Sequence, residues 1–299
     1  MRTVFVAGAT GYLGRFLCAE YQRRGWHVRA LVREASQGEG LAANACVQAQ
    51  ATMPETLRGK LDGVDLVISA LGITRQADGL QYRDVDYQAN LNLLVEAQRA
   101  GVKRFAYIHV LNANRMTTVP LVMAKTAFVR ALQVASISST IIAPSGYFSD
   151  MADFLEMARR GRVWLFGAGD HRINPIHGAD LAVATADAIA HERAWIDVGG
   201  PETFSHVELG EAAFAALGRQ PKISHLPDCL RKLALAVVPR LAPRRIGGPV
   251  QFFLSAMGMD MTGEPHGTRR LIDHLEQLCA GPHQTPQARP MVGELSDDA

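Results

Sequence analysis

The chain has 299 residues, of which 48% are hydrophobic and 20% charged, and its formal net charge is +2. This size and composition suit one large α/β domain, or one domain with a small appendage, that buries a sizeable core. The charge gives no electrostatic case for nucleic-acid binding, and four scattered cysteines without a CxxC pair favour neither a metal site nor a disulfide framework.

The sequence predicts a cytoplasmic protein without a transmembrane segment. Its first residues, "RTVFVAGATG", are typical of a strand rather than of a signal peptide. The longest purely aliphatic run near the C-terminal end, "LALAVV", is far shorter than a membrane span.

Apolar runs alternate with amphipathic helices through the first half of the chain. The runs predict strands at "TVFVAGA", "HVRALVR", "CVQAQA", "VDLVISALG", "RFAYIHVLNA" and "STIIAP". Among the helices between them, one is expected over residues 84–101 and another around Lys125. The alternation predicts an α/β fold, with a Rossmann-like doubly wound parallel sheet over residues 1–146.

The pattern changes from residue 147 onward. We expect residues 147–280 to form a small C-terminal α/β lobe, interleaved with the sheet, that holds the substrate. Ser205 and Glu208 form an S-x-x-E capping box before a helix, and further helices are expected over 229–238, 250–261 and 268–279. His177 is expected to be structural and Asp180 to cap a helix. The polar, proline-containing tail, residues 281–299, is predicted to be disordered.

A glycine motif follows the first strand and opens the first helix. "GATGYLG" places glycines at Gly8, Gly11 and Gly14. In a dinucleotide site Gly8 permits a tight turn, Gly11 lets the backbone approach a pyrophosphate, and Gly14 lets the helix pack on the sheet. The helix N-terminus favours an anion there. The alternative is a tight turn that binds no ligand.

The end of the second strand indicates which dinucleotide binds. Enzymes that use NAD usually carry an acidic residue there, whereas this chain has Arg33, which suits a 2′-phosphate. Arg15 is a possible second cation, and solvated surface is the alternative for both arginines. The prediction is NADP(H) rather than NAD(H).

Six segments together resemble a known family. They are "GATGYLG", "VDLVISALG", "VDYQANLNLLVEAQRAGVKRFAYI", "PSGYFSDM", "NPIHGADLA" and "GPETFSHVELGEAAFAALG". The chain resembles the atypical short-chain dehydrogenase/reductases, in the group of NmrA-like and isoflavone-reductase-like proteins. The resemblance implies a Rossmann-like sheet with a small C-terminal substrate lobe. It also implies cofactor contacts at Gly8, Thr10, Gly11, Tyr12, Leu13, Gly14 and Arg33, at Ala70, Leu71 and Gly72, at Lys125, and at Pro144, Ser145 and Gly146.

The chain departs from this family where the acid is expected. In ordinary members a tyrosine four residues before the lysine is the general acid, and this chain has Leu121 there. Relatives often have Ser or Thr after the fifth strand, where this chain reads His109, Val110 and Leu111. Because leucine cannot donate a proton, ordinary carbonyl–alcohol interconversion is not expected.

Three interpretations of Lys125 stay open. It binds the nicotinamide ribose, it is itself the catalytic proton donor, or it lies on an exposed helix face. His109 either acts at the cofactor or is a hydrogen-bonded structural residue, and Tyr147 either offers a hydroxyl to the substrate or packs against the lobe. Four apolar residues wall a pocket or fill the core, namely Phe252, Phe253, Met257 and Met261.

Two functions are consistent with these residues. The first is an NADPH-dependent reductase that acts on a small apolar conjugated or carbonyl substrate. The alternative is a non-catalytic NAD(P)H-binding redox sensor or an assembly or accessory factor with a protein partner. The basic residues Arg231, Lys232, Arg240, Arg244 and Arg245 flank apolar stretches and indicate either peripheral membrane contact or, as we prefer, a helix with a wet face. No metal site is expected.

Overall fold

The computed structural model describes residues 1–73, 79–242 and 244–280, with the backbone alone for residues 244–246. An eight-stranded sheet forms its centre, in the order β12-β9-β6-β5-β4-β1-β2-β3, and every neighbouring pair is parallel. The strands are β1 (Thr3–Ala7), β2 (His27–Val32), β3 (Ala45–Gln48), β4 (Leu66–Ser69), β5 (Arg104–Ile108), β6 (Ser138–Pro144), β9 (Trp195–Gly199) and β12 (Glu264–Pro265). The prediction of a Rossmann-like parallel sheet is confirmed. The tail that we expect to be disordered lies outside the described residues.

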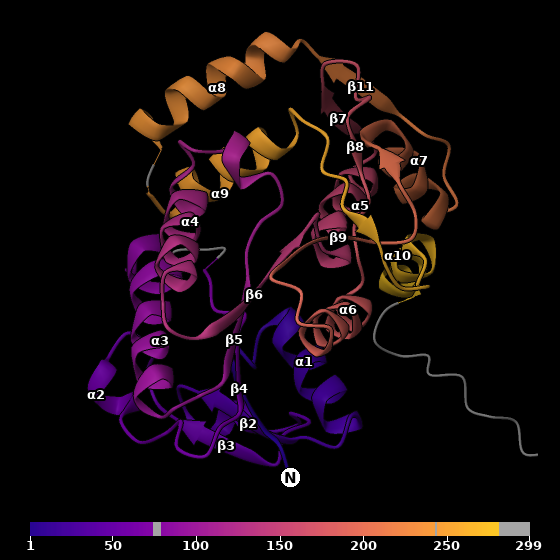
Figure 1. Ribbon diagram of the computed structural model, residues 1–299. Helices are drawn as coiled ribbons and strands as arrows, with labels where there is room; N and C mark the ends of the chain where they lie inside the picture. Colours follow the sequence, from indigo (N-terminus) through magenta and orange to yellow (C-terminus); the bar gives the residue numbers. More distant parts are fainter. Residues whose placement is uncertain (74–78, 243, 281–299) are drawn as a thin grey trace, which may run out of the picture.

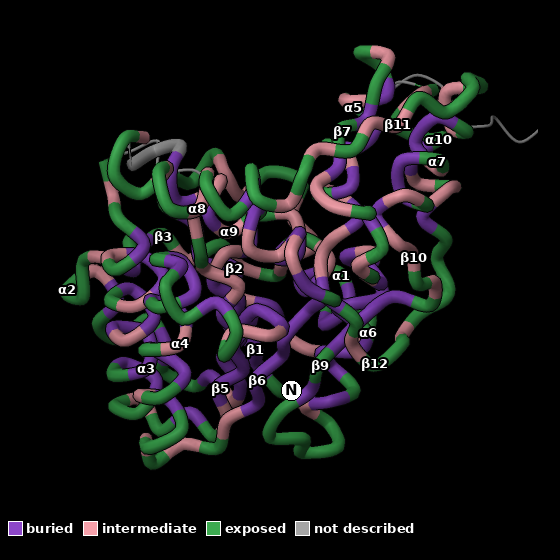
Figure 2. Tube along the Cα trace, turned by 90° about the horizontal axis from the view of Figure 1, so that it is seen from above, coloured by how far each residue is buried: buried purple, intermediate pink, exposed green. Residues whose placement is uncertain are grey.

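Helices cover both faces of the sheet (Figure 1). On one face α1 (Tyr12–Arg23) packs beside α6 (Gly178–Ala190), and the other face carries α2 (Pro54–Leu57), α3 (Asn90–Arg99) and α4 (Pro120–Gln133). Side chains alternate along β1, so that Val4 and Val6 pack under α1 while Phe5 and Ala7 pack with the second group of helices. The tube in Figure 2 is buried along these central strands and exposed at the rim.

The segment before α3 differs from the predicted continuous helix over 84–101. Residues Arg83–Ala89 form η2, a π-helical segment, and the α-helix begins only at Asn90. The buried Asn90 side chain donates hydrogen bonds to the carbonyls of Val85 and Asp86, each at 3.1 Å. A side chain that bonds to carbonyls four and five residues earlier fits a widened turn.

The C-terminal lobe has its own core. Helices α5 (Ala152–Arg159), α7 (His206–Ala216) and α10 (Leu271–Ala280) pack around the pair of β7 (Val163–Phe166) and β11 (Ile223–Leu226). A second small pair joins β8 (Arg172–Ile173) to β10 (Phe204–Ser205). Short 3-10 turns complete the chain: η1 (Ala35–Gly38), η3 (Ala113–Arg115) and η4 (Phe148–Met151). The predicted capping box of Ser205 and Glu208 is present at the start of α7.

Two predictions for the lobe need correction. The N-cap of α6 is His177, whose Nδ1 accepts from the Ala179 N–H, while Asp180 accepts from the N–H groups of Thr268 and Arg269 and so ties α6 to the segment before α10. The helices expected over 229–238 and 250–261 are α8 (Asp228–Leu241) and α9 (Arg244–Ala256), with Pro239 and Pro249 inside them.

The helix expected over 250–261 ends earlier than predicted, because α9 stops at Ala256. A Cβ at Gly258 would lie 2.2 Å from the guanidinium of Arg231. Met257 and Met261 are therefore outside the helix and fill core positions, whereas Phe253 is 40% exposed. The core interpretation holds for the two methionines.

Candidate functional site

The glycine loop between β1 and α1 has the backbone shape that a dinucleotide site requires. Gly8 has φ +80°, and a Cβ there would lie 2.8 Å from the carbonyl carbon and oxygen of Ala70 at the end of β4. A Cβ at Gly14 would lie 2.0 Å from the Gly8 carbonyl oxygen and 2.7 Å from the Ala9 Cα. Gly8 therefore permits the turn, and Gly14 permits the close approach of α1, as the motif predicts.

The first turn of α1 is suited to an anion. It contains no acidic side chain, and the helix N-terminus carries partial positive charge. The Leu13 side chain is buried in the core, so this residue can contact a bound anion only through its backbone. The Tyr12 hydroxyl accepts from the Gly178 N–H at 3.1 Å, which fixes the loop against α6, and Arg15 Nε donates to the Thr10 carbonyl at 3.2 Å.

Lys125 lies inside the protein, at the tip of β4. Its side chain leaves the middle of α4, and its Nζ lies 3.3 Å from Asp86 Oδ1 and 3.2 Å from the Ile108 carbonyl oxygen. A Cβ at Gly72 would lie 3.2 Å from this Nζ and 2.7 Å from Asp86 Oδ1. Lys125 is only 9% exposed, so the interpretation as a surface lysine is wrong.

Asp86 is fully buried on η2, and its Oδ2 accepts from the Ile73 N–H. Burial raises the pKa of Asp86, and the neighbouring ammonium of Lys125 opposes that shift. Sequence reasoning missed this residue, although the signal was available: Asp86 stands four residues before Asn90, and the two polar residues share a face with apolar neighbours.

The hydroxyl of Tyr107 on β5 lies 3.5 Å from Lys125 Nζ. Tyr107 is fully buried, and burial raises its pKa well above the usual value. Its hydroxyl already donates to the Asp86 carbonyl at 3.4 Å inside the protein, so it is not available to a substrate as an acid. Leu121 lies one turn before Lys125 on α4 and is buried in an apolar cluster, so the position of the expected tyrosine offers no proton donor.

The end of β6 closes the same edge of the sheet. Pro144 and Ser145 are buried, and Ser145 Oγ donates to the Asn174 carbonyl at 2.5 Å. Asn174 in turn bonds to the backbone of Gly200 and Gly263. Asn174 thus joins the ends of β6, β9 and β12, which gives the "NPIHGADLA" segment a structural role that its sequence did not reveal.

Two further predicted positions lie at the rim. Arg33 directly follows β2 and is exposed. His109 follows β5, is 3% exposed and packs edge-on against Trp195, with ring centroids 5.7 Å apart. Burial lowers the pKa of His109 to about 3, so its ring is neutral at pH 7. Its Nδ1 has no hydrogen-bond partner among the described residues, so no hydrogen bond at this nitrogen supports the structural interpretation.

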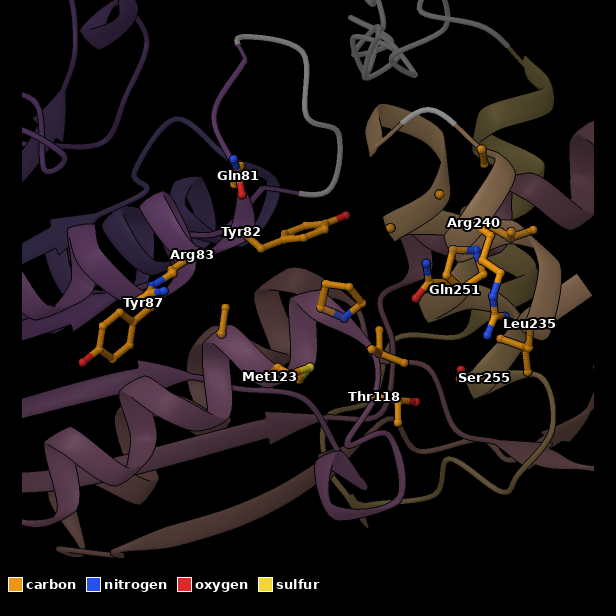
Figure 3. A pocket seen from close by; sticks show the side chains of 18 of the residues that line it. Gln81, Tyr82, Arg83, Tyr87, Thr118, Met123, Leu235, Arg240, Gln251 and Ser255 are labelled. Carbon is orange, nitrogen blue, oxygen red and sulfur yellow. The ribbon is translucent and has the colours of Figure 1, made fainter.

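A cleft of about 1250 Å³ opens beside α4 (Figure 3). One wall is the start of η2 with the residues just before it, the floor is the first half of α4, and the opposite wall is the inner face of α8 and α9. Ala124, the chain neighbour of Lys125, belongs to its lining. A second cavity of about 760 Å³ lies beyond α4 and includes His109, Trp195 and Asp197.

The comparison with protein families decides to which family the chain belongs. Residues 8–192 match the family described as NAD(P)H-binding, which is more than half of the chain. The chain belongs to the NAD(P)H-binding family. Solved structures agree on the fold: NADPH-dependent quinone oxidoreductase from Escherichia coli, complexed with NADPH, has a TM-score of 0.70 at 21% identity over 92% of this chain and 99% of that chain. The resemblance to atypical short-chain dehydrogenase/reductases is confirmed.

A further structural neighbour is the Citrobacter sp. triphenylmethane reductase complexed with NADP(H), with a TM-score of 0.68 at 19% identity, covering 91% of this chain and 94% of that one. Among characterised relatives, divinyl chlorophyllide a 8-vinyl-reductase of Arabidopsis thaliana is 29% identical over 269 residues, or 80% of this chain and 63% of the relative. Photosystem II assembly factor Ycf39 of Synechocystis sp. is 27% identical over 230 residues, or 75% of this chain and 70% of the relative.

The chain thus spans slightly under two thirds of the length of the Arabidopsis reductase. Within the described ranges, no helix is both long and apolar enough to cross a bilayer. The same residues contain no group of three or more His, Cys, Asp or Glu side chains that could hold a metal ion.

Proposed function

We propose that the chain is an NADPH-dependent reductase that transfers a hydride to an apolar conjugated or carbonyl substrate without a tyrosine acid. The observation that carries this proposal is the meeting of three features at one edge of the sheet: the glycine loop, Gly72, and the buried Lys125–Asp86 pair. Because Gly72 has no side chain, the ammonium of Lys125 can lie close to the chain that follows β4, where we expect it to meet the cofactor ribose.

The residues at this edge have separate roles in the proposal. The loop of Gly8, Thr10, Gly11, Tyr12, Leu13 and Gly14 holds the pyrophosphate through backbone N–H groups at the start of α1. Ala70, Leu71 and Gly72 line the adenosine or ribose, and Pro144, Ser145 and Gly146 pass near the carboxamide. When bound, NADPH supplies the hydride. Lys125 binds the nicotinamide ribose, and Asp86 is a positioning residue that orients it.

The choice of NADPH rests on Arg33. It is exposed at the end of β2, where a guanidinium suits the 2′-phosphate and no acidic residue takes the corresponding place. Structural neighbours with NADPH and NADP(H) bound support this choice.

The substrate class follows from the missing acid. Reduction of an activated carbon–carbon double bond places less demand on a tyrosine than reduction of a carbonyl does. The Arabidopsis relative is named for the reduction of a vinyl group, which supports a conjugated substrate in this chain. The apolar cleft beside α4 is the proposed place for it.

A fluorescence titration with NADPH and NADH, at one fixed salt concentration, tests the proposal. We expect NADPH to bind at least about tenfold tighter than NADH, which is about 1.4 kcal/mol, and Arg33→Ser to remove that preference. Arg160→Ser, at an exposed site on the lobe, serves as the matched control and should change neither affinity. Failure of both cofactors to bind would refute the proposal.

The second candidate function is that of a non-catalytic redox sensor or assembly factor. Leu121 in place of the acid favours it, as does the likeness to proteins named as photosystem II assembly factors. The two functions differ in one result. If the protein binds NADPH but oxidises it with no enone, quinone or aldehyde, while NADPH and NADP⁺ act differently on a protein partner, the accessory role is correct.

We also propose that α8 contacts an anionic membrane surface. Leu230, Leu233, Val237 and Leu241 are spaced by three and four residues along one face of the helix, and each is at least 38% exposed. The preferred expectation of a wet face therefore does not describe this side of α8. Lys232 is also exposed on α8, where it pairs with Asp228 at 3.2 Å, and its positive charge would attract anionic headgroups. Peripheral contact of this kind is compatible with a cytoplasmic location, which stays a prediction.

A further inference from the structure

The charged residues of the cleft beside α4 all have the same sign. Its lining includes two arginines, Arg83 of η2 and Arg240 of α8, and among the described lining residues there is no aspartate or glutamate. Figure 3 shows that they come from opposite walls. Neither guanidinium forms an ion pair with a described carboxylate. Among the described residues, Arg240 donates to the Ala236 carbonyl of its own helix.

The rest of the lining is mostly apolar. Val119 directly precedes α4 and Pro120 begins it, while Leu235 and Val238 come from the inner face of α8. At about 1250 Å³ the cleft exceeds the roughly 300–1,000 Å³ that holds a drug-sized ligand. An apolar body of considerable size, with negative charge on it, matches these walls.

Tyr82 supplies a polar group that has no partner inside the protein. Its side chain is 3% exposed, lines the cleft, and has a hydroxyl without any hydrogen-bond partner among the described residues. Its ring lies against Gly248 of α9, where a Cβ would approach it to 2.5 Å. Burial raises the pKa of Tyr82 to about 12, so the hydroxyl keeps its proton and can donate. A buried hydroxyl without a partner is costly unless a ligand satisfies it.

We propose that this cleft binds a large apolar molecule that carries a carboxylate, with Arg83 and Arg240 as charge partners and Tyr82 as a hydrogen-bond donor. Guanidinium groups suit carboxylates because they donate two parallel hydrogen bonds. This inference rests on the proposed function, because the bound molecule would be the substrate of the proposed reductase. Its test measures binding alone, so it can fail while cofactor binding holds, and the reverse.

The probes are protoporphyrin IX, its dimethyl ester, and oleate, each titrated by quenching of protein fluorescence. The acid and the ester share one apolar ring system and differ in charge, while oleate carries a carboxylate on a flexible chain. We expect protoporphyrin IX to bind at least about tenfold tighter than its ester. Tighter binding of oleate than of protoporphyrin IX would assign the cleft to a fatty acid rather than to a ring acid.

Three variants locate the binding. Arg83→Gln and Arg240→Gln should each weaken the binding of protoporphyrin IX about tenfold while leaving the binding of the ester unchanged. Arg160→Gln, at the exposed residue directly after α5, is the matched control. Tyr82→Phe should weaken the acid without lowering Tm, because it removes a hydroxyl that has no partner in the free protein. Equal affinities for acid and ester, or arginine variants that behave like the control, would overturn the proposal. NADPH affinity, measured in parallel, reports separately on the cofactor site.

Discussion

Two glycines of one loop should respond in opposite ways to the same added methyl group. At Gly11 the backbone has φ −74°, and a Cβ would lie 3.3 Å from the Gly8 carbonyl oxygen, which is a tight but tolerable contact. At Gly14 the Cβ would lie 2.0 Å from that same oxygen and 2.7 Å from the Ala9 Cα, so that it would overlap backbone atoms. Gly11→Ala should therefore leave the fold intact, whereas Gly14→Ala should push α1 away from the sheet.

The magnitudes follow from these contacts. Overpacking costs about 1–3 kcal/mol, and the backbone overlap at Gly14 puts Gly14→Ala at about 3 kcal/mol. At about 2 °C or more per kcal/mol, its Tm should fall by about 6 °C or more. Gly11→Ala should keep its Tm within about 2 °C. Alanine allows the unfolded chain fewer backbone conformations than glycine does, and this stabilising effect offsets the tight contact. Its NADPH affinity should fall at least about tenfold, because the methyl group stands where the pyrophosphate approaches the backbone.

Thermal melts and NADPH titrations of both variants separate the two effects. Gly11→Ala with wild-type NADPH affinity would show that no phosphate approaches this loop. Gly14→Ala with a wild-type Tm would show that the close approach of α1 to β1 is not as described.

Three other predictions concern charge and exposure. Asp86→Asn and Lys125→Met should each lower the free energy of unfolding by about 3 kcal/mol. The double variant should lose less than the sum of the two, because it leaves no buried charge unpaired. Additive losses in urea unfolding would contradict the ion pair. The pKa of His109 in the folded protein is about 3, below its ordinary value of 6.5. Between these two pH values the unfolded chain binds a proton at His109 and the folded protein does not. The free energy of unfolding therefore falls as pH drops from 6.5 towards 3, by up to about 4 kcal/mol. His109→Gln should flatten that slope, and an unchanged slope would refute the assignment. Leu233→Glu with Leu241→Glu should abolish sedimentation with phosphatidylglycerol vesicles, and retained binding would exclude α8 as the membrane contact.

Sequence reasoning found the sheet because its signals are local. Each of the first six strands is a short apolar run that ends at a turn, and β1 to β6 occur where these runs predict them. The tight turn at Gly8 and the close helix packing at Gly14 were predicted for the same reason, because a positive φ and a close helix approach each require glycine at that position.

The centre of the site could not be predicted in this way. Asp86 meets Lys125 across 39 residues of chain, and this pairing depends on the widened turn at η2, which Asn90 stabilises by its own hydrogen bonds. No periodicity in the sequence marks a π-helical segment. The outward stripe on α8 was missed for a different reason: its basic neighbours are visible in the sequence, but which face is covered depends on α9, whose start was predicted six residues late.

The surroundings of Lys125 bear on which of its two remaining roles is correct. Three groups surround the Lys125 Nζ: Asp86 Oδ1 forms an ion pair with it at 3.3 Å, and the Ile108 carbonyl oxygen and, at the longest distance, the Tyr107 hydroxyl accept hydrogen bonds from it. A ribose hydroxyl can replace the weakest of these contacts without changing any charge. Donating a proton to a substrate would instead leave Asp86 as a buried carboxylate without its counter-charge, which is the more costly change. If the proposed function holds, Lys125 is therefore better suited to hold the cofactor than to act as the acid, and the proton that completes the reduction comes from solvent. That requirement is met more easily by a conjugated double bond than by an isolated carbonyl, in agreement with the missing tyrosine.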